Sequence, residues 1–303
     1  MYLIETNQLT KRYGKTNVVD HVDMHIPEGS IYGFVGENGS GKTTIMRLLT
    51  GLAEPTSGTY TLFGVSNKSR EIYKVRNQMS AIVEVASLVP SMTAKENMRY
   101  AESYLGIKLS DEERDEYLRL VGLDNVGKKK TKNFSLGMRQ RLAISIALIN
   151  KPKLMLLDEP MNGLDPEGIA ELRNLLIDLN ANQGITVLIS SHILSELEKI
   201  ATTYGFILKG KMLEEISLQG LIEKCQRSTT IRVDNLQEAI PVVESLGYLK
   251  HQTYPNDELR IFADVDINTL VVALDKKKIK VLSLKTNDEK VEDYYLNLLR
   301  EVR

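Results

Sequence analysis

A glycine-rich turn at residues 36–44 constrains the fold of this chain more than any other feature. It reads "GENGSGKTT" and matches the spacing G-x-x-x-x-G-K-[ST]. The apolar run "IYGFV" before it predicts a buried strand, and "KTTIMRLLTGL" after it predicts a helix. Glycines let the backbone wrap closely around an anion, and the start of the following helix carries a positive dipole end. The stretch therefore predicts a phosphate-binding loop.

The side chains of this loop match the groups of a nucleotide. Lys42 can bridge the β- and γ-phosphates, and the Thr43 hydroxyl can ligate Mg²⁺. The chain has no N-K-x-D string, which would specify guanine, so ATP is the expected nucleotide. The candidate nucleotide contacts in the loop are Gly36, Glu37, Asn38, Gly39, Ser40, Gly41, Lys42, Thr43 and Thr44.

Two acids and a histidine follow later apolar runs. "LMLL" ends in Asp158 and Glu159, and the carboxyl ends of parallel strands are where open α/β sheets bind ligands. Asp158 is expected to hold the metal directly or through water, and Glu159 to act as the general base toward the attacking water. His192 lies just past the next apolar strand, in "ISSHIL", where its imidazole can reach the γ-phosphate. These residues predict hydrolysis of ATP with Mg²⁺ as cofactor.

The order of apolar strands and helices predicts the fold class. "KLMLLDEP" and "ITVLISSH" are separated by a helical stretch, which is typical of a parallel sheet covered on both faces. We therefore expect an α/β P-loop NTPase over residues 1–225, with a RecA-like parallel core. Short strands before residue 35 would form an antiparallel β subdomain, and residues 87–150 a helical subdomain. "GFILKGKMLEE" is expected to close this unit as a hairpin.

Residues 226–303 lack any chemical motif and are expected to form a small α+β domain. The pattern predicts strand 229–234, helix 236–246, strands near 249–253 and 258–262, helix 267–276, strand 279–285 and helix 289–302. The order βαββαβ indicates a ferredoxin-like domain. It is expected to sense a ligand or partner, or to support a dimer.

Composition excludes several classes of protein. The 303 residues carry a net charge of -1, which gives no general attraction to nucleic acid, and a single cysteine, which fits a reducing compartment. No run approaches the ~18 apolar residues of a membrane span. We therefore expect a cytoplasmic protein with no nucleic-acid partner. His21, Asp23 and His25 share one face of a half-buried strand, but a solvent-facing surface is favoured over a metal site because no fourth ligand is evident.

The order of the motifs carries a resemblance. The phosphate loop, "FSLGMRQRLAIS", "LMLLDEP", "NGLDP" and "SSH" resemble, in this order, the ATP-binding subunits of ABC transporters over residues 1–225. The resemblance implies that Tyr13 stacks on adenine, and that Ser135 and Gly137 meet the γ-phosphate bound by a second protomer. Asp165 would lie in the loop through which two protomers communicate. It further implies a homodimer that sandwiches ATP, a separate membrane-spanning permease, and a peripheral position at the inner face of the cell membrane.

Within this family, the chain is most similar to the branch that exports bacitracin and lantibiotics, because of "SLGMRQRL", the "IVE" segment and the C-terminal appendage. This resemblance implies a peptide or amphipathic cargo, although a lipid fits equally. Two departures stand out. Glu84 occupies a position that usually holds glutamine; it can still touch Mg²⁺ or the attacking water, but adds negative charge near the γ-phosphate. Leu136 and Met138 replace a glycine and the glutamine of Ser-Gly-Gly-Gln. The alternative is a soluble ABC-type ATPase not engaged in transport.

Overall fold

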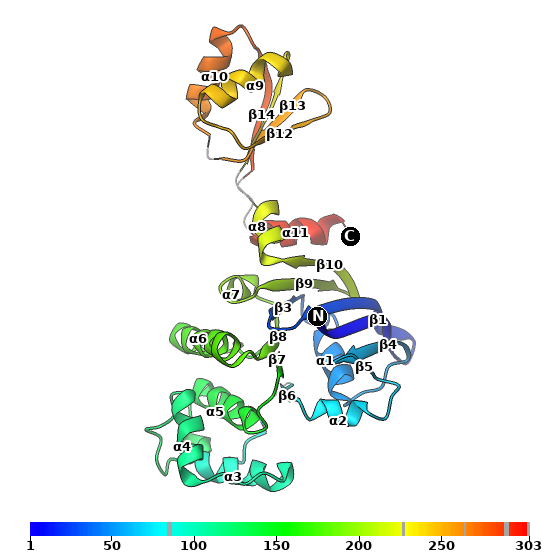
Figure 1. Ribbon diagram of the computed structural model, residues 1–303, viewed down its shortest axis with the longest axis vertical. Coiled ribbons are helices and arrows are strands. Elements are labelled where there is room, and N and C mark those ends of the chain that lie inside the picture. The colour runs from blue at the N-terminus through cyan, green and yellow to red at the C-terminus, as the bar shows by residue number, and fades with distance from the viewer. Residues whose placement is uncertain (84–86, 226–227, 264, 288–290, 302–303) are drawn as a thin grey trace. The chain divides into compact units, whose positions relative to one another are not determined.

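The computed structural model describes residues 1–83, 87–225, 228–263, 265–287 and 291–301. It comprises two compact units, Met1–Leu218 and Gln219–Arg303 (Figure 1). The expected boundary lay after residue 225, whereas the boundary between the compact units places most of helix α8 (Leu218–Lys224) in the second unit.

A six-stranded sheet forms the centre of the first unit. Its strands, in spatial order, are β10 (Lys211–Ser217), β9 (Thr203–Leu208), β3 (Ile31–Val35), β8 (Thr186–Ser191), β7 (Leu154–Asp158) and β6 (Met79–Ile82). The neighbours from β9 to β6 are parallel, and β10 forms the predicted antiparallel hairpin with β9. Every residue of β3, β7 and β8 is buried, as a parallel sheet covered on both faces requires.

Helices cover both faces of this sheet. Helix α1 (Lys42–Thr50) lies on one face, and α6 (Pro166–Gln183) and α7 (Leu194–Leu197) lie on the other (Figure 1). The apolar residues of α1 share one core with those of β7 and of a second, antiparallel sheet. Burial of large aliphatic side chains in such a core contributes about 1.5–3 kcal/mol each. This packing fixes the start of α1 at the end of β3.

The antiparallel sheet has the strand order β2-β1-β4-β5. Its strands are β1 (Tyr2–Tyr13), β2 (Thr16–Pro27), β4 (Ser57–Leu62) and β5 (Val65–Ser66). The expectation of only short strands was wrong, since β1 and β2 have 12 residues each. Gln8 and His21 have φ of 49° and 52°, and the register of the two strands shifts around them. These irregularities let two long strands bend while they stay paired.

Strand β2 is half-buried, as predicted. Val22, Met24 and Ile26 are fully buried, whereas His21 and Asp23 are exposed. His21 contacts Asp20 at 2.8 Å, and His25 contacts Glu215 at 2.8 Å. The two histidines of the polar face of β2 therefore contact different acidic side chains. Within the described ranges, no three His, Cys, Asp or Glu side chains are grouped so that they could hold a metal ion.

Residues 87–150 contribute three α-helices, α3 (Ala94–Leu105), α4 (Asp111–Leu120) and α5 (Leu136–Leu148). A shorter helix, α2 (Ile72–Arg76), precedes them, and the 3-10 turn η1 (Thr131–Asn133) leads into α5. Ser110 and Glu113 form a capping box at the start of α4. Glu102 of α3 and Arg114 of α4 form a buried ion pair at 2.7 Å. The pair ties α3 to α4, beside the helix that carries Ser135.

The second unit has the predicted βαββαβ order. Its elements are β11 (Ser228–Val233), α9 (Leu236–Ser245), β12 (His251–Tyr254), β13 (Glu258–Ile261), α10 (Ile267–Lys276), β14 (Val281–Asn287) and the additional C-terminal helix α11 (Val291–Glu301). The sheet order β12-β13-β11-β14, with antiparallel neighbours throughout, is the ferredoxin-like arrangement. Strand β12 begins at His251, slightly later than predicted, after a turn in which Gly247 has φ of 89°.

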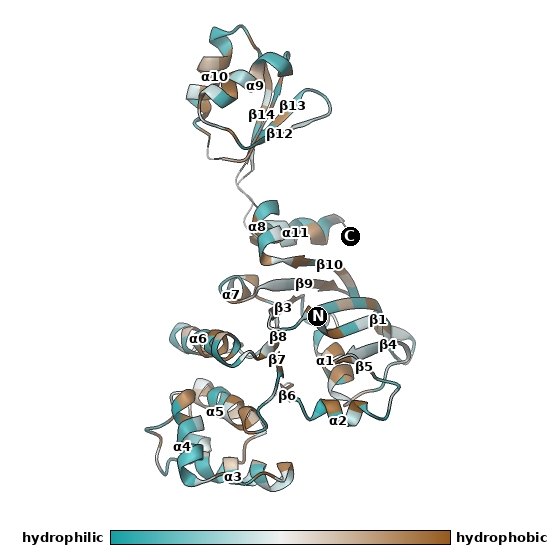
Figure 2. Cartoon of the chain, viewed as in Figure 1, coloured by the Kyte–Doolittle hydropathy of each residue, from teal (hydrophilic) through white to brown (hydrophobic). Residues whose placement is uncertain are grey.

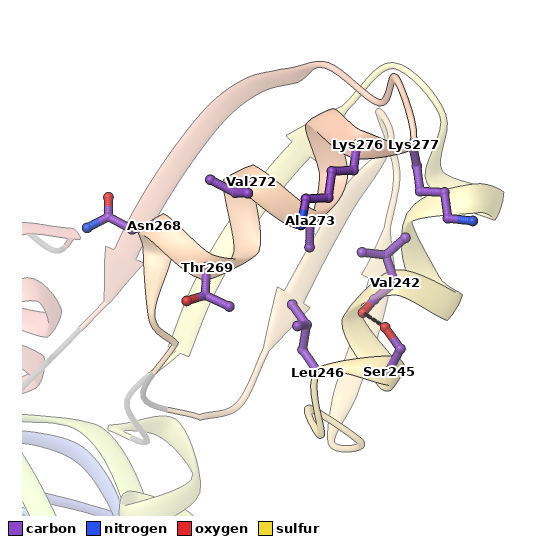
Figure 3. Close-up of a pocket in the computed structure, with 9 residues that line it drawn as sticks. All are labelled: Val242, Ser245, Leu246, Asn268, Thr269, Val272, Ala273, Lys276 and Lys277. Carbon is purple, nitrogen blue, oxygen red and sulfur yellow. Dashed lines mark hydrogen bonds between the residues drawn. The ribbon is translucent and has the colours of Figure 1, made fainter.

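Helices α9 and α10 of this unit are amphipathic. In α10, Leu270 and Leu274 are fully buried in the core, while Asn268 and Lys276 are exposed. Both hydrophobic and hydrophilic segments occur along the two helices (Figure 2). A hollow lies between α9 and α10, with Val242 and Leu246 among its lining residues (Figure 3). None of the helices in the described part of the chain combines the length and apolar character that a membrane span requires.

Candidate functional site

The glycine-rich loop joins the end of β3 to the start of α1. A side chain at Gly36 would lie 2.6 Å from the Ile207 carbonyl oxygen, and one at Gly41 would lie 2.7 Å from that of Val18. Gly41 also has φ of 110°, which side chains rarely tolerate. Glycine is therefore required at both positions for the loop to pack against its neighbouring strands.

Other parts of the loop remain accessible. Glu37, Asn38 and Gly39 form an exposed tip, and Thr44 is half-buried in the first turn of α1.

Ser40 of the same loop is buried. It is 3% exposed, and its hydroxyl has no hydrogen-bond partner among the described residues. Buried polar groups normally have a partner. An unpaired hydroxyl in this loop is consistent with contact to a polar ligand.

Lys42 lies at the centre of the site. Its side chain is 5% exposed. Its ammonium donates to the backbone carbonyls of Gly36 at 2.6 Å and Glu37 at 3.2 Å. The same nitrogen lies 3.3 Å from Oε1 of Glu159. The structure thus joins the loop lysine to the second acid of "LMLLDEP", residues that are far apart in sequence.

Asp158 is held by two hydroxyl groups at the end of β7. The Thr43 hydroxyl donates to Oδ2 at 2.7 Å, and the Ser190 hydroxyl donates to Oδ1 at 2.7 Å. The carboxylate is buried, and these charge-assisted hydrogen bonds offset the loss of its hydration. The structure therefore places two of the three predicted metal ligands, Thr43 and Asp158, in direct contact.

Ser190 is a site residue that the sequence analysis missed. It pairs with Asp158 in the parallel register of β7 and β8. The signal was available in "ISSHIL", since a serine near the end of a buried strand, beside a strand that ends in an acid, faces the same sheet edge. An apolar strand by itself, however, does not reveal which strand is its neighbour.

Glu159 has an uncommon backbone conformation. Its φ is 48°, in the left-handed region that residues other than glycine seldom adopt. Its backbone N–H donates to the Ser190 hydroxyl at 2.8 Å, and its Oε2 lies 2.8 Å from Nδ1 of His192. Strained backbone of this kind persists where surrounding contacts determine it. The predicted base and the predicted histidine are thus direct partners.

Tyr13 lies at the end of β1, in the turn that leads to β2. Its side chain is 48% exposed, and Lys11 Nζ lies 5.0 Å from the ring centroid. Strand β2 begins after this turn, and its Val18 packs against Gly41 of the phosphate loop. The hairpin that carries Tyr13 is therefore anchored beside the loop.

Ser135, Gly137 and Asp165 form a separate group. Ser135 caps α5 by accepting a hydrogen bond from the Met138 N–H at 3.2 Å, and Asp165 caps α6 by accepting one from the Gly168 N–H at 3.0 Å. The three residues line one hollow, which does not include Lys42, Asp158 or Glu159. The structure of one chain therefore brings these candidates to each other rather than to the phosphate loop. Glu84 lies outside the described residues.

Similarity to known proteins identifies the class. A sequence model described as "ABC transporter" matches residues 19–162. The bacitracin transport ATP-binding protein BcrA of Bacillus licheniformis is 37% identical over 98% of this chain and 97% of its own length. The lantibiotic transport ATP-binding protein SrtF of Streptococcus pyogenes is 44% identical over 72% of this chain and 92% of its own length.

Solved structures agree with this assignment. A dimeric ATP-binding cassette in a post-hydrolysis state with ADP and Pi has a TM-score of 0.64 and 26% identity, over 72% of this chain and 99% of that one. The chain therefore belongs to the ABC transporter family. It is an ATP-binding subunit that hydrolyses ATP, and the predicted P-loop NTPase fold is confirmed.

Proposed function

We propose that this chain uses Mg²⁺-dependent ATP hydrolysis to power export through a separate membrane-spanning permease. The observation that carries the proposal is the group of contacts joining Lys42, Thr43, Asp158, Glu159 and His192 at one sheet edge. It combines a cation for phosphate, hard oxygen donors and a carboxylate held beside an imidazole. These are the parts that metal-assisted attack of water on a phosphate requires.

The residues around Asp158 fit Mg²⁺. A hydroxyl and a carboxylate are the hard oxygen donors that this cation prefers, and Thr43 and Asp158 present both within 2.7 Å of each other. When bound, Mg²⁺ would neutralise charge on the phosphates. Thr43 and Asp158 would hold it, and Ser190 keeps one oxygen of Asp158 occupied so that the other faces Thr43. Glu84 is a third candidate ligand from the sequence.

Glu159 is the proposed general base, and His192 and Lys42 position it. The imidazole contact fixes one carboxylate oxygen and the lysine attracts the other. A carboxylate held in this way is already oriented, so that taking a proton from water costs no further rotational freedom. The loop contacts from Gly36 to Thr44, with Tyr13 against the adenine, complete the proposed ATP site.

Two copies are proposed to complete each other's sites. Ser135 and Gly137 begin helix α5, where N–H groups and the helix dipole attract anions. Ser135 and Leu136 are exposed, Leu136 to 41%, and Gly137 is half-buried. Asp165 lines the same hollow, and the cassette solved with ADP and Pi is dimeric. We therefore place the γ-phosphate of the partner's ATP at this hollow.

A variant that binds but does not hydrolyse ATP tests the dimer. Glu159→Gln should lower the hydrolysis rate by about 10²–10⁴-fold and accumulate as a dimer in ATP and Mg²⁺, measured by gel filtration with light scattering. Adding Ser135→Arg should return it to a monomer that still binds ATP. Glu112→Gln, an exposed acid of α4, is the matched control and should behave like the wild type. A Glu159→Gln protein that stays monomeric with saturating ATP would contradict the proposal.

An apolar groove in the first unit is the proposed docking site for the permease. It is lined by β6, α5 and the end of α3, and includes Leu52 and Tyr104, which are 72% and 66% exposed. Exposed apolar surface of this kind marks an interaction site, and an amphipathic helix of the partner fits a groove. Docking there would hold the chain at the inner face of the membrane.

Charge placed in this groove tests the docking. The double variant Leu52→Glu, Tyr104→Glu should lose co-purification of the permease from solubilised membranes and keep its ATP affinity. Tyr73→Glu is the matched control, because Tyr73 is 67% exposed on α2 outside the groove. Equal recovery of the permease with the double variant and the control would exclude this surface.

The relatives named above are transport subunits for bacitracin and lantibiotics, which favours a peptide antibiotic or another amphipathic cargo over the soluble alternative. Cells that express the chain with its permease should tolerate more bacitracin than cells with the Glu159→Gln variant. Equal growth inhibition in both strains would exclude bacitracin as cargo and direct attention to other amphipathic molecules, lipids included.

A further inference from the structure

One buried hydroxyl connects the two acids of the site. Ser190 lies on β8 beside Asp158 of β7 and is 0% exposed. Its hydroxyl donates to Oδ1 of Asp158 at 2.7 Å and accepts the N–H of Glu159 at 2.8 Å. The oxygen thus contacts the side chain of one acid and the backbone of the next.

The bond to Asp158 sets the direction of its carboxylate. With Oδ1 bound by Ser190, Oδ2 is directed to the Thr43 hydroxyl at 2.7 Å. Residues that hydrogen-bond a metal-ligating group orient it, and their loss usually weakens metal binding. The hydroxyl of Ser190 is therefore placed to keep Oδ2 of Asp158 next to the Thr43 hydroxyl.

The bond to Glu159 sets the direction of its backbone. Glu159 has φ of 48°, and its backbone N–H donates a hydrogen bond to the Ser190 hydroxyl at the edge of the sheet. This conformation determines where the side chain leaves the backbone, and from there it reaches His192 and Lys42. Without an acceptor, a buried N–H would be left unpaired and the conformation would lose support.

We infer that Ser190 is a positioning residue that sets the geometry of both acids through a single hydroxyl. Its hydroxyl contacts the side chain of Asp158 and the backbone of Glu159, and it acts on the site through these two residues. The inference rests on the proposed role of Asp158 toward Mg²⁺. The inference applies to Ser190 and not to the next residue, Ser191, whose hydroxyl instead contacts Glu196 at 3.0 Å.

The test measures how Mg²⁺ changes nucleotide affinity in the full-length chain. Wild type, Ser190→Ala and Ser190→Thr are titrated with a fluorescent ATP analogue in Mg²⁺ and in EDTA. In Ser190→Ala, affinity in Mg²⁺ and the rate of hydrolysis should each fall about 10–100-fold, while affinity in EDTA stays unchanged, because Lys42 and the loop glycines are intact. Ser190→Thr keeps the hydroxyl on a strand-compatible side chain and should retain the Mg²⁺ response.

Thr186→Val is the matched control on the same strand. Thr186 is 0% exposed and accepts the Gly29 N–H at 2.8 Å, far from the acids in the β7–β8 register. It should lower thermal stability without changing the Mg²⁺ response. If Ser190→Ala does not fold, Ser190→Cys carries the test, because its thiol is a weak hydrogen-bonding group of similar size.

Three results would overturn the inference: a wild-type Mg²⁺ response in Ser190→Ala or Ser190→Cys, an equal loss of affinity in Mg²⁺ and in EDTA, or a loss in Ser190→Thr as large as in Ser190→Ala. A wild-type chain that binds ATP equally well in Mg²⁺ and in EDTA would instead contradict the proposed Mg²⁺ site itself. The wild-type titration therefore distinguishes failure of the proposed function from failure of the role of Ser190.

Discussion

Both units of this chain pack helices on a sheet, but their strands run differently. In the first unit β3, β8 and β7 are parallel neighbours, so their carboxyl ends meet at one edge and bring together the phosphate loop, Ser190 and Asp158. In the second unit every neighbouring pair is antiparallel, so strand ends alternate between edges. Parallel strands thus gather functional side chains at a single edge, whereas antiparallel strands distribute their ends between two edges.

The buried polar groups of the two units differ in the same way. The first unit buries Lys42, Asp158 and Ser190 within one network. Among the described residues of the second unit, the polar side chains that are buried are those of Ser228 and Thr229, on one strand. The first unit therefore gives up some of its apolar interior to charged groups, while the second keeps a nearly apolar core.

The largest expected effect falls on the core of the second unit. Leu259 is fully buried there, and Leu259→Ala should destabilise that unit by about 2–5 kcal/mol. ATP affinity of the monomer should stay the same, because the phosphate site belongs to the first unit. Calorimetry and a titration with a fluorescent ATP analogue measure the two effects. Loss of ATP affinity in this variant would show that the units are coupled.

A pair of lysines sharpens the comparison. Lys42→Ala should weaken ATP binding by about 10–100-fold, because charged hydrogen bonds contribute roughly 1.5–3 kcal/mol. Lys276→Ala removes the same side chain from the exposed end of α10, at the hollow in Figure 3, and should change ATP affinity little. Isothermal titration with both variants measures this. A similar loss in both would mean that the second unit also contributes charge to the site.

Acidification should affect the first unit more than the second. The hydrogen-bonded Arg114 guanidinium holds the pKa of Glu102 below its ordinary value of 4.5. The unfolded chain therefore takes up this proton first as the pH falls. The Glu102–Arg114 pair therefore contributes its full stability above about pH 4.5. This stability is lost as the pH falls through the lower pKa that Glu102 has in the folded chain. Hydrogen bonds from Thr269 also lower the pKa of Asp266 in the second unit, but that carboxylate is exposed and screened by water.

Thermal unfolding between pH 7 and pH 3, followed by calorimetry, measures this difference. Glu102→Gln should be less stable than the wild type at pH 7 and should lose less stability on acidification. Asp266→Asn provides the matched change in the second unit and should alter the pH profile less. Parallel profiles for wild type and Glu102→Gln would contradict the role of the buried pair.

The smallest expected effects come from helix caps. Ser110→Ala in the first unit and Asn235→Ala in the second each remove a side chain that accepts a backbone N–H at the start of a helix. Each should cost its own unit about 1 kcal/mol, measured by denaturant unfolding. Cap energies depend on the first turn alone, so similar values are expected despite the different sheets. A much larger loss at Asn235 would show that this side chain does more than cap its helix.

Much of the fold could be predicted because its signals are local. The phosphate loop, the apolar runs of β3, β7 and β8, and the cap at Ser110 depend on residues that are close in sequence. The βαββαβ order of the second unit followed from the same periodicity. Long, bent strands were missed, because the irregularities at Gln8 and His21 depend on the register in which β1 and β2 pair rather than on residue type.

The candidate site divides along the same line. The sequence by itself determined which residue types were available: glycines at 36, 39 and 41, a lysine, two adjacent acids and a histidine, in an order that resembles one family. Only the tertiary structure decided that Ser190 joins Asp158 to Glu159, that Glu159 adopts φ of 48°, and that Lys42 and His192 approach the same carboxylate. The physical reason is that hydrogen bonds between neighbouring strands depend on their order and register, and strands with similar apolar sequences do not specify which of them become neighbours.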